Sequence, residues 1–211
     1  MNNGVYFVAK RLIDILGALV GIVIFSPVLV IAALAIRLDS PGSVVFIQRR
    51  VGKGGKFFGM YKLRSMLENA EELLEKDPEL MARYRAGSFK LENDPRVTRV
   101  GRFLRKWSID EAPQFFNILR GEMSLVGPRA FKPDEFEEQR KKFPEVAADA
   151  VLALSVKPGL TGLWQVSGRS EIPFRERIRL DAEYTRRCSL WEDVKILLKT
   201  PWIVIQCKGA R

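Results

Sequence analysis

Two adjacent carboxylates, Asp110 and Glu111, lie between a basic run and the apolar segment 115–119. This arrangement suits chemistry on a phosphate, because cationic side chains hold an anionic group while a carboxylate attacks it or binds a metal ion. Four other adjacent acidic pairs lie in polar helical patterns, and we interpret them as solvated faces. The basic run contains Arg96, Arg99, Arg102, Arg105 and Lys106, and the other pairs are Glu71-Glu72, Asp134-Glu135, Glu137-Glu138 and Glu192-Asp193.

The same carboxylates also have a structural interpretation. Ser108 and Glu111 match a capping box, in which the two side chains bind backbone amides at a helix start. Pro113 argues against Ser108 as the cap, since proline is best tolerated in the first helical turn. We therefore expect Asp110 or Ile109 as the cap, where the helix dipole favours both an ionised carboxylate and a bound phosphate. A cap and a catalytic site are compatible.

Composition limits the kinds of function that the chain can have. Its 211 residues suggest one domain, or one domain with a small appendage. The net charge of +10 indicates an anionic partner: nucleic acid, a phospholipid surface or a phosphorylated substrate. The absence of histidine excludes histidine acid–base catalysis, metal ligation and triads. Cys188 and Cys207 lack metal-ligand spacing, and we interpret them as small apolar fillers in a reducing compartment.

Residues 15–36 form an uncharged apolar segment of 22 residues. As one helix it would be roughly 33 Å long, which is enough to cross a bilayer. It is long for the apolar core of a cleaved signal peptide, and no small-residue cleavage site follows. A helix that enters and leaves the membrane on one side, a simple span and a buried soluble helix remain as interpretations.

Two features favour the first of these interpretations. Basic residues flank both ends of the segment, which suggests that both ends face the cytoplasm. Ser26-Pro27 lies in the middle, where proline removes a backbone hydrogen bond and kinks the helix, and Ser26 can bind the freed carbonyl. We therefore expect a re-entrant helix-break-helix hairpin at residues 1–38, followed by a cytoplasmic catalytic domain at residues 39–211. The flanking basic residues are Lys10, Arg11, Arg37, Arg49, Arg50, Lys53 and Lys56.

The rest of the chain predicts an α-rich α+β fold. Segments 44–51 and 57–63 predict a β-hairpin, and the turn 52–56 does not match a phosphate-binding loop. Helices are expected at 67–76, from Pro78, at 98–107, up to Gly121, and at 133–142, 174–187 and 190–199, with a long loop at 157–170. Trp191, Val194 and Leu198 share one helical face, which indicates either core packing or contact with the membrane surface.

Four blocks of the sequence resemble the bacterial sugar transferase family, the monotopic polyprenyl-phosphate phosphoglycosyl transferases. They are YKLRSM at 61–66, the segment 94–119 that begins DPRVTRVG, MSLVGPR at 123–129 and KPGLTGLWQVSGR at 157–169. One departure is Ala130, where many members have a second proline. Larger members carry additional N-terminal transmembrane helices, so the resemblance predicts a minimal catalytic form.

The resemblance implies transfer of a sugar-1-phosphate from a UDP-sugar to polyprenyl phosphate, at the cytoplasmic face of the bacterial inner membrane, as the first membrane step of glycoconjugate assembly. Asp110 would be the nucleophile that forms an aspartyl phosphosugar. Glu111 would bind Mg²⁺, or position and deprotonate the lipid phosphate. The candidate residues for phosphate and nucleotide binding are Lys62, Arg64, Arg105, Pro128, Arg129, Gln165 and Arg169, with Trp164 beside them.

Two other functions compete with this one. The basic run of a membrane-anchored nucleic-acid-binding protein would track phosphates, but an acidic pair inside that run and the lack of a nucleic-acid motif argue against it. An inactive membrane scaffold would not need the intact acidic pair. We therefore expect nucleotide-sugar and polyprenyl phosphate substrates, membrane lipids as partners and no nucleic acid.

Overall fold

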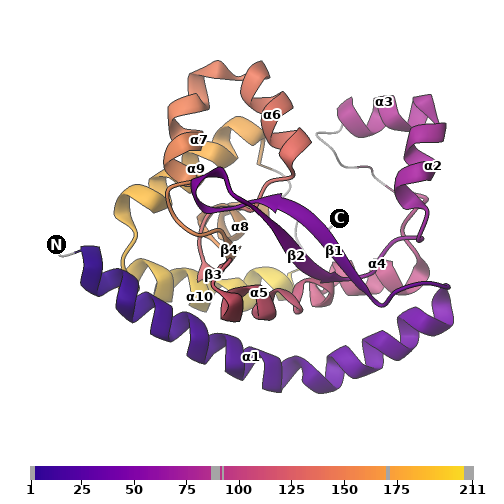
Figure 1. Cartoon of the computed structure of the whole chain (residues 1–211), viewed down its shortest axis with the longest axis horizontal. Coiled ribbons are helices and arrows are strands. Elements are labelled where there is room, and N and C mark those ends of the chain that lie inside the picture. Colours follow the sequence, from indigo (N-terminus) through magenta and orange to yellow (C-terminus); the bar gives the residue numbers. More distant parts are fainter. Residues whose placement is uncertain (1–2, 87–90, 92, 170–171, 207–211) are drawn as a thin grey trace.

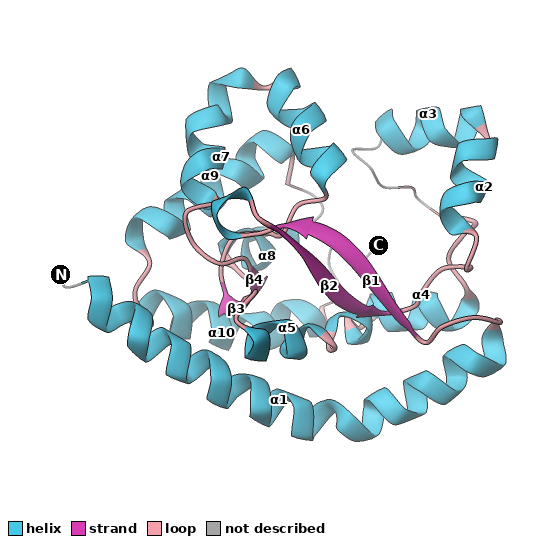
Figure 2. Ribbon diagram, viewed as in Figure 1, coloured by secondary structure: helices cyan, strands magenta, loops and turns pink. Residues whose placement is uncertain are grey.

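The computed structural model describes residues 3–86, 91, 93–169 and 172–206, and Cys207 lies outside them. It has the predicted α-rich α+β character (Figures 1 and 2). The elements are α1 (Asn3–Asp39), β1 (Val45–Val51), η1 (Lys53–Gly55), β2 (Phe57–Leu63), α2 (Ala70–Lys76), α3 (Pro78–Ala86), α4 (Arg99–Lys106), η2 (Ile109–Glu111), α5 (Gln114–Arg120), β3 (Ser124–Val126), α6 (Pro133–Lys142), η3 (Pro144–Val146), α7 (Ala147–Ala153), β4 (Gly159–Thr161), α8 (Leu163–Ser167), α9 (Phe174–Arg187) and α10 (Leu190–Ile205).

Helix α1 is a single helix of 37 residues that bends near its middle. Figure 1 shows it bowed around the rest of the chain, with its apex pointing away from the other elements. Pro27 cannot donate a hydrogen bond to the Val23 carbonyl, and the Ser26 hydroxyl donates to that carbonyl instead, at 2.9 Å. The role expected for Ser26 is confirmed. The expected break is corrected, because the substitute hydrogen bond lets the helix continue through the bend.

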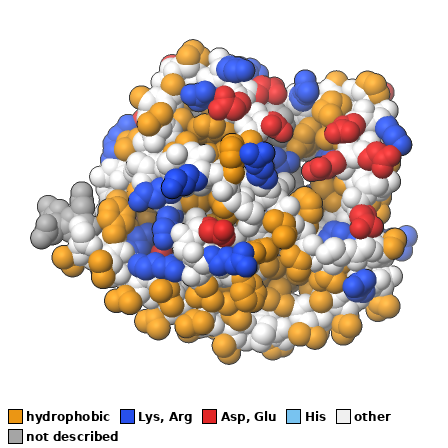
Figure 3. Space-filling model, in the orientation of Figure 1, with side chains coloured by type: hydrophobic (Ala, Val, Ile, Leu, Met, Phe, Trp, Pro, Cys, Tyr) orange, Lys and Arg blue, Asp and Glu red, His pale blue; other side chains and the backbone are white. Residues whose placement is uncertain are grey.

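The inner side of α1 packs on the hydrophobic core of the molecule, and its outer side is exposed and apolar. Ala18 and Ile22 join the core with Phe115 of α5, and a Cβ at Gly21 would lie 2.5 Å from the Phe115 ring. Along its outer side run Val5, Val8, Leu12, Leu16, Leu19, Val20, Val23, Ile24, Val30, Ile31, Leu34 and Leu38. Figure 3 shows this apolar surface along one edge of the molecule.

Helix α1 is also long and apolar enough to cross a membrane by length and composition. Only 17% of its most apolar 18-residue window is buried. The core helix of a soluble protein would bury most of such a window, so the structure argues against the soluble-core interpretation.

The predicted β-hairpin is present, and the side chain of Asn117 hydrogen-bonds to the edge of β2 that faces away from β1. Strands β1 and β2 pair antiparallel, with Val45 opposite Leu63. On the other edge of β2, the buried side chain of Asn117 accepts a hydrogen bond from the Tyr61 amide at 2.9 Å. The same side chain donates to the Gly59 carbonyl at 2.7 Å. Asn117 therefore acts like a short neighbouring strand and fixes β2 to α5.

The second half of the chain contains elements that the sequence did not predict. The segment expected to be a loop at 157–170 contains strand β4, which pairs parallel with β3, and the short helix α8. Helix α7 was also not predicted, and α10 runs beyond residue 199 to Ile205. Short elements of three to seven residues carry too little periodicity to be recognised from sequence.

Two of the acidic pairs interpreted as solvated are partly buried. Glu135 is buried and lies 3.5 Å from the Arg177 guanidinium. Asp193 is buried and accepts hydrogen bonds from Lys10, Tyr6 and Tyr184. Both residues occupy inward positions of their helices, where partners from other elements offset the cost of burial.

We expect Asn117→Ala to lower the free energy of unfolding by about 2–4 kcal/mol, because it leaves the Tyr61 amide and the Gly59 carbonyl unpaired on a strand edge. Asn69→Ala removes an exposed asparagine that forms no capping hydrogen bond and is the matched control. Chemical denaturation in one detergent measures both variants. Equal stability of the two variants would contradict the role assigned to Asn117.

Candidate active site

Asp110 and Glu111 lie in the 3₁₀ turn η2, between α4 and α5. Ser108, just before this turn, has a left-handed backbone with φ of 55°. Helix α5 begins at Gln114 with Pro113 as its N-cap residue, and no side chain caps it. The capping interpretation is therefore wrong: the hydroxyl of Ser108 accepts a hydrogen bond from Arg169 at 3.0 Å, and the acidic pair precedes the helix in a separate turn.

Glu111 forms an ion pair with Lys62 of β2, with Nζ 3.0 Å from Oε1. Burial alone would raise the pKa of Glu111, but Lys62, Arg129 and Arg169 outweigh it, so this pKa lies below its usual range. The Glu111 side chain is 38% exposed. It is therefore an ionised carboxylate that solvent can reach at one end of β2.

Asp110 is more deeply buried, at 6% exposure. Burial raises its pKa, Lys62 opposes the rise, Glu111 adds to it and Arg105 opposes it again. The two neighbouring carboxylates are thus pushed in opposite directions, since one is partly exposed and ion-paired while the other is enclosed. A poorly solvated carboxylate is a stronger nucleophile once it is ionised, and the surrounding cations keep ionisation accessible.

The cations near the pair come from four separate parts of the chain. Lys62 extends from β2, and Arg105 extends from the last turn of α4, where its Nε donates to the Ser65 hydroxyl at 2.8 Å. Arg129 follows β3, and Arg169 follows α8 with a φ of 54°. The four cations outnumber the two carboxylates, and the remaining positive charge favours the binding of a diphosphate.

Several buried polar atoms of the predicted binding residues have no hydrogen-bond partner among the described residues. Nε of Arg129 and Nη1 of Arg169 belong to cations that act on Glu111, and Oε1 of Gln165 belongs to α8. Buried polar groups in folded proteins nearly always have partners. These three residues were predicted from sequence to bind substrate, and their free donors and acceptor are consistent with a polar ligand between α8 and η2.

Other residues proposed from sequence have tasks away from the pair. The Arg64 guanidinium donates to the carbonyls of Pro41 and Ser40, which closes the C-terminal end of α1. Arg96 is buried and pairs with Asp94, with Nη2 2.7 Å from Oδ2. Pro128 is buried, and its carbonyl accepts from the Gly159 amide at 2.8 Å. These contacts make the three residues part of the framework that holds the site.

Trp164 was named beside the candidate nucleotide-binding residues, but its ring is already covered by two guanidinium groups. The Cζ atom of Arg129 lies 4.9 Å from the ring centroid, and that of Arg177 lies 5.0 Å from it. The stack orients Arg129, whose backbone amide also donates to Asp181 at 3.2 Å. We therefore assign Trp164 to positioning Arg129.

Arg177 and Asp181 are the members of this framework that the sequence interpretation missed. Burial raises the pKa of Asp181 to about 7, while the Arg129 amide and the Arg177 side chain oppose the rise. Burial also lowers the pKa of Arg177 to about 10. A usable signal was present, because the two residues lie four apart on the apolar face of α9, with Phe174 and Ile178.

The pair offers two carboxylates as metal ligands, and no cluster of three or more acidic or cysteine ligands occurs among the residues that the structure describes. Mg²⁺ commonly binds one or two carboxylates and completes its shell with substrate phosphates and water. The partly exposed carboxylate of Glu111 fits this pattern, since one oxygen pairs with Lys62 and the side chain reaches solvent.

Comparison with known proteins decides the family. The family model described as bacterial sugar transferase matches residues 5–207. The chain belongs to this family. It is 42% identical over 205 residues to an undecaprenyl-phosphate galactose phosphotransferase of Salmonella typhimurium, covering 95% of this chain and 41% of that protein. It is 41% identical over 206 residues to the exopolysaccharide production protein ExoY of Rhizobium meliloti, covering 96% of this chain and 88% of ExoY.

A third relative is the UDP-glucose:undecaprenyl-phosphate glucose-1-phosphate transferase of Caulobacter vibrioides, 42% identical over 196 residues, which cover 90% of this chain and 67% of that protein. The chain spans less than half the length of several curated relatives that it matches. The predicted family is therefore confirmed across nearly all of this chain.

The opposed pKa shifts lead to a test that needs no substrate. We expect Lys62→Met to raise the pKa of both Asp110 and Glu111, because Lys62 lowers both in the native protein. Carbon-13 NMR titration of labelled carboxylates measures the two values. Lys76→Met removes an exposed lysine that is paired with Glu72, and it is the control that leaves both values unchanged. Unchanged values in Lys62→Met would contradict the described geometry.

Proposed function

We propose that this chain transfers a sugar-1-phosphate from a UDP-sugar to polyprenyl phosphate, with Asp110 carrying the sugar phosphate between the two. The observation that carries the proposal is the buried carboxylate of Asp110, held beside an ionised Glu111 and among four cations. The names of two relatives support it, since both describe transfer of a sugar phosphate to undecaprenyl phosphate.

The reaction has two displacement steps at one phosphorus atom. First, a carboxylate oxygen of Asp110 attacks the sugar-bearing phosphorus, and the bond to the oxygen shared with UMP breaks, so UMP leaves with that electron pair. An oxygen of the polyprenyl phosphate then attacks the same phosphorus, the bond to Asp110 breaks, and the carboxylate is restored. Covalent catalysis of this kind divides one difficult transfer between two anions into two easier steps.

The cations reduce the electrostatic repulsion among the Asp110 carboxylate, the diphosphate of the UDP-sugar and the phosphate of the polyprenyl acceptor. Arg129 and Arg169 have free buried donors that suit the diphosphate of the UDP-sugar. Lys62 pairs with Glu111 and also lowers the pKa of Asp110. Gln165 supplies an acceptor for a hydroxyl or amide of the nucleotide or sugar. We propose that Arg105 stabilises the ionised carboxylate of Asp110, whose pKa it lowers. Charge that is fixed in advance stabilises the transition state without reorganisation.

We further propose that Glu111 ligates Mg²⁺ together with the substrate diphosphate. When bound, Mg²⁺ neutralises charge that develops on the leaving phosphate. Because Glu111 is the residue next to Asp110, we also propose that it orients the incoming lipid phosphate for attack beside Asp110.

We propose that α1 enters one leaflet and returns, so that the catalytic part stays on the cytoplasmic face of the inner membrane. The segments of α1 before and after Pro27 that carry no charge, residues 15–26 and 28–36, are roughly 18 and 14 Å long, about half of a ~30 Å hydrocarbon core. The apex of the bow points away from the catalytic part, which supports shallow insertion (Figure 1).

The proposed parts are an anchor at residues 1–38 and a catalytic part at residues 39–211, and they share one core. Ala18, Ile22 and Phe25 of α1 pack with Phe115 and Ile118 of α5. Trp191, Val194 and Leu198 of α10 are exposed, so core packing does not explain their shared face. We propose that this face of α10 lies against the membrane surface.

We expect Asp110→Asn to reduce UMP release from a UDP-sugar by at least about 10³-fold, because an amide oxygen is a poor nucleophile. Membrane association should persist, since α1 is unchanged. Asp134→Asn alters an exposed aspartate of α6 and should retain full release. Full release by Asp110→Asn would refute the nucleophile assignment, and a screen of UDP-sugars with a polyprenyl phosphate acceptor would identify the donor.

Removing divalent metal with a chelator should stop UMP release, and added Mg²⁺ should restore it. We expect Glu111→Gln to need on the order of 10-fold more Mg²⁺ for half-maximal release, because one anionic ligand is lost. Glu137→Gln, at an exposed position of α6, is the control. An unchanged Mg²⁺ requirement in Glu111→Gln would remove that residue from the proposed ligand set.

The re-entrant arrangement predicts that both ends of α1 face the same side. Single cysteines replacing Asn3 and Ser43 in a cysteine-free background should react with an impermeant maleimide from the same side of sealed vesicles. A cysteine replacing the exposed Lys141 of α6 marks the catalytic side. Labelling of residues 3 and 43 from opposite sides would establish a span instead.

A further inference from the structure

A polar pocket lies at the N-terminal half of α1, apart from the acidic pair. Its cavity volume is about 150 Å³, and its walls come from α1, η1, β3, residues 156–157 and the end of α9. None of the catalytic candidates lines it. Lys53 precedes β2 and Lys62 lies near its far end, so at ~3.3 Å per residue the strand alone separates the two regions by roughly 17 Å.

Four cations line this pocket: Lys10, Arg11, Lys53 and Lys157. The one carboxylate among its lining residues is Asp14. Burial and then the neighbouring Arg11 lower the pKa of Lys157, which reflects the cost of gathering positive charges in a partly enclosed space. A bound anion would remove that cost.

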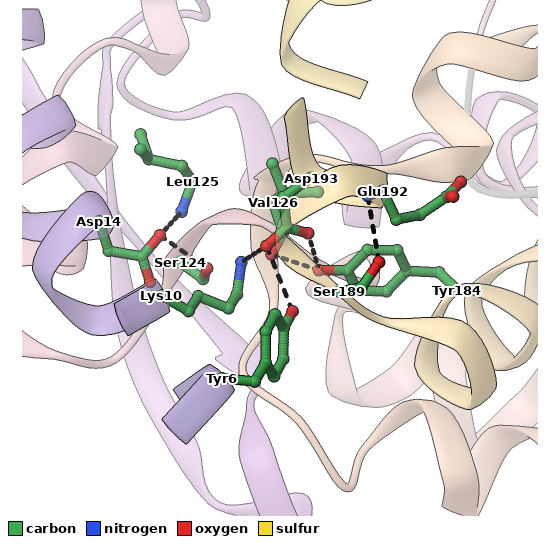
Figure 4. A network of polar contacts seen from close by, with 10 residues as sticks. All are labelled: Tyr6, Lys10, Asp14, Ser124, Leu125, Val126, Tyr184, Ser189, Glu192 and Asp193. Atoms are coloured by element: carbon green, nitrogen blue, oxygen red, sulfur yellow. Dashed lines mark hydrogen bonds and ion pairs between the residues drawn. The ribbon is translucent and has the colours of Figure 1, made fainter. Parts of the chain in front are cut away.

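The acidic groups near the pocket are already engaged. Asp14 accepts hydrogen bonds from the Ser124 hydroxyl and the Leu125 amide, both at 2.9 Å. Asp193, which does not line the pocket, accepts from Lys10 at 2.8 Å and from two tyrosine hydroxyls, as Figure 4 shows. Lys10 therefore has a partner, and Asp14 is held by β3.

Among the remaining cations, Arg11 is held in place without a carboxylate. Arg11 donates to the carbonyls of Ile118 and Leu119 at 2.6 and 2.8 Å, at the end of α5. Within the described part of the chain, Lys53 and Lys157 form no ion pair with a carboxylate. The Nζ of Lys157 and the Arg11 guanidinium both approach Gly121, where an added Cβ would lie 3.4 and 3.5 Å from them.

The surroundings of the pocket indicate what kind of anion it takes. Val5, Phe7 and Val8 are exposed on the same end of α1, beside the lysines. Figure 3 shows Lys and Arg side chains gathered next to the apolar edge of the molecule. An anionic group in the pocket can therefore be joined to apolar chains that lie along α1. The volume exceeds by far the roughly 10–15 Å³ that one water needs, so a phosphate group fits.

We propose that this basic pocket binds the phosphate of an anionic phospholipid, with Lys53 and Lys157 as its free cations and Arg11 as a fixed third. The lipid phosphate would join α1 to η1 and to the strand β4 region at the membrane surface, on the side of the molecule away from Asp110. The shared chemistry is a phosphate anion, which free phosphate can also supply.

The test uses calorimetric titration of the full chain in a neutral detergent. The probes are short-chain phosphatidylglycerol, short-chain phosphatidylcholine and inorganic phosphate. We expect phosphatidylglycerol to bind at least about 10-fold more tightly than phosphatidylcholine, because the choline cancels the phosphate charge. The double variant Lys53→Gln/Lys157→Gln should weaken phosphatidylglycerol binding by about 30-fold, since each lysine near an anionic lipid contributes substantially.

Two control variants distinguish a specific effect of the pocket lysines from an effect of net charge or of misfolding. Lys141→Gln/Lys142→Gln removes the same charge at exposed positions of α6 and should bind phosphatidylglycerol like the native chain. Lys53→Arg/Lys157→Arg keeps the charge and should retain affinity within about threefold of native. Circular dichroism and thermal melting confirm that each variant is folded.

Each outcome decides the proposal. Lysine-dependent binding of phosphatidylglycerol alone supports a lipid headgroup, and equal, lysine-dependent binding of inorganic phosphate supports the anion site with free phosphate as its ligand. Equal phosphatidylglycerol affinity of the native and Lys53→Gln/Lys157→Gln chains would overturn the proposal. An equal loss in the α6 double variant would overturn it as well, because the effect would then be one of net charge.

Discussion

The position of the acidic pair depends on the buried side chain of Asn117. Its amide group binds the free edge of β2 from α5, which fixes the strand that carries Lys62 against the helix that follows Asp110 and Glu111. A two-stranded hairpin is marginal by itself, and its unpaired edge would otherwise need another strand or water. Because α5 also packs on α1, one side chain links the polar site to the membrane-facing helix.

The site separates two chemically similar groups by their surroundings. The carboxylate of Glu111 pairs with Lys62 and is partly exposed to solvent, whereas that of Asp110 is buried. The pKa of Glu111 is therefore lowered from its usual value and that of Asp110 is raised. Three of the four cations, Lys62, Arg129 and Arg169, come from elements distant in sequence from the pair, so the full charge balance exists only after folding. In the stack of Arg129, Trp164 and Arg177, two large side chains orient the guanidinium group of Arg129.

Helix α1 has to satisfy two environments along its length. Its inner side meets close-packed core residues such as Phe115, while its outer side is an exposed apolar surface. At the bend, Ser26 replaces the hydrogen bond that Pro27 removes, which is the condition for keeping bent backbone in an apolar medium. The basic pocket lies at the N-terminal half of this helix, where an apolar surface meets concentrated positive charge.

Features that depend on local pattern could be predicted from the sequence: the uncharged segment 15–36, the β-hairpin, most long helices and the acidic pair Asp110-Glu111. Tertiary structure alone decided which cations surround that pair. Arg64 and Arg129 look equivalent in sequence, yet Arg64 binds carbonyls at the end of α1 while Arg129 approaches Glu111. Burial and charge pairing depend on which elements meet in space, and a list of residue types and spacings does not contain that information.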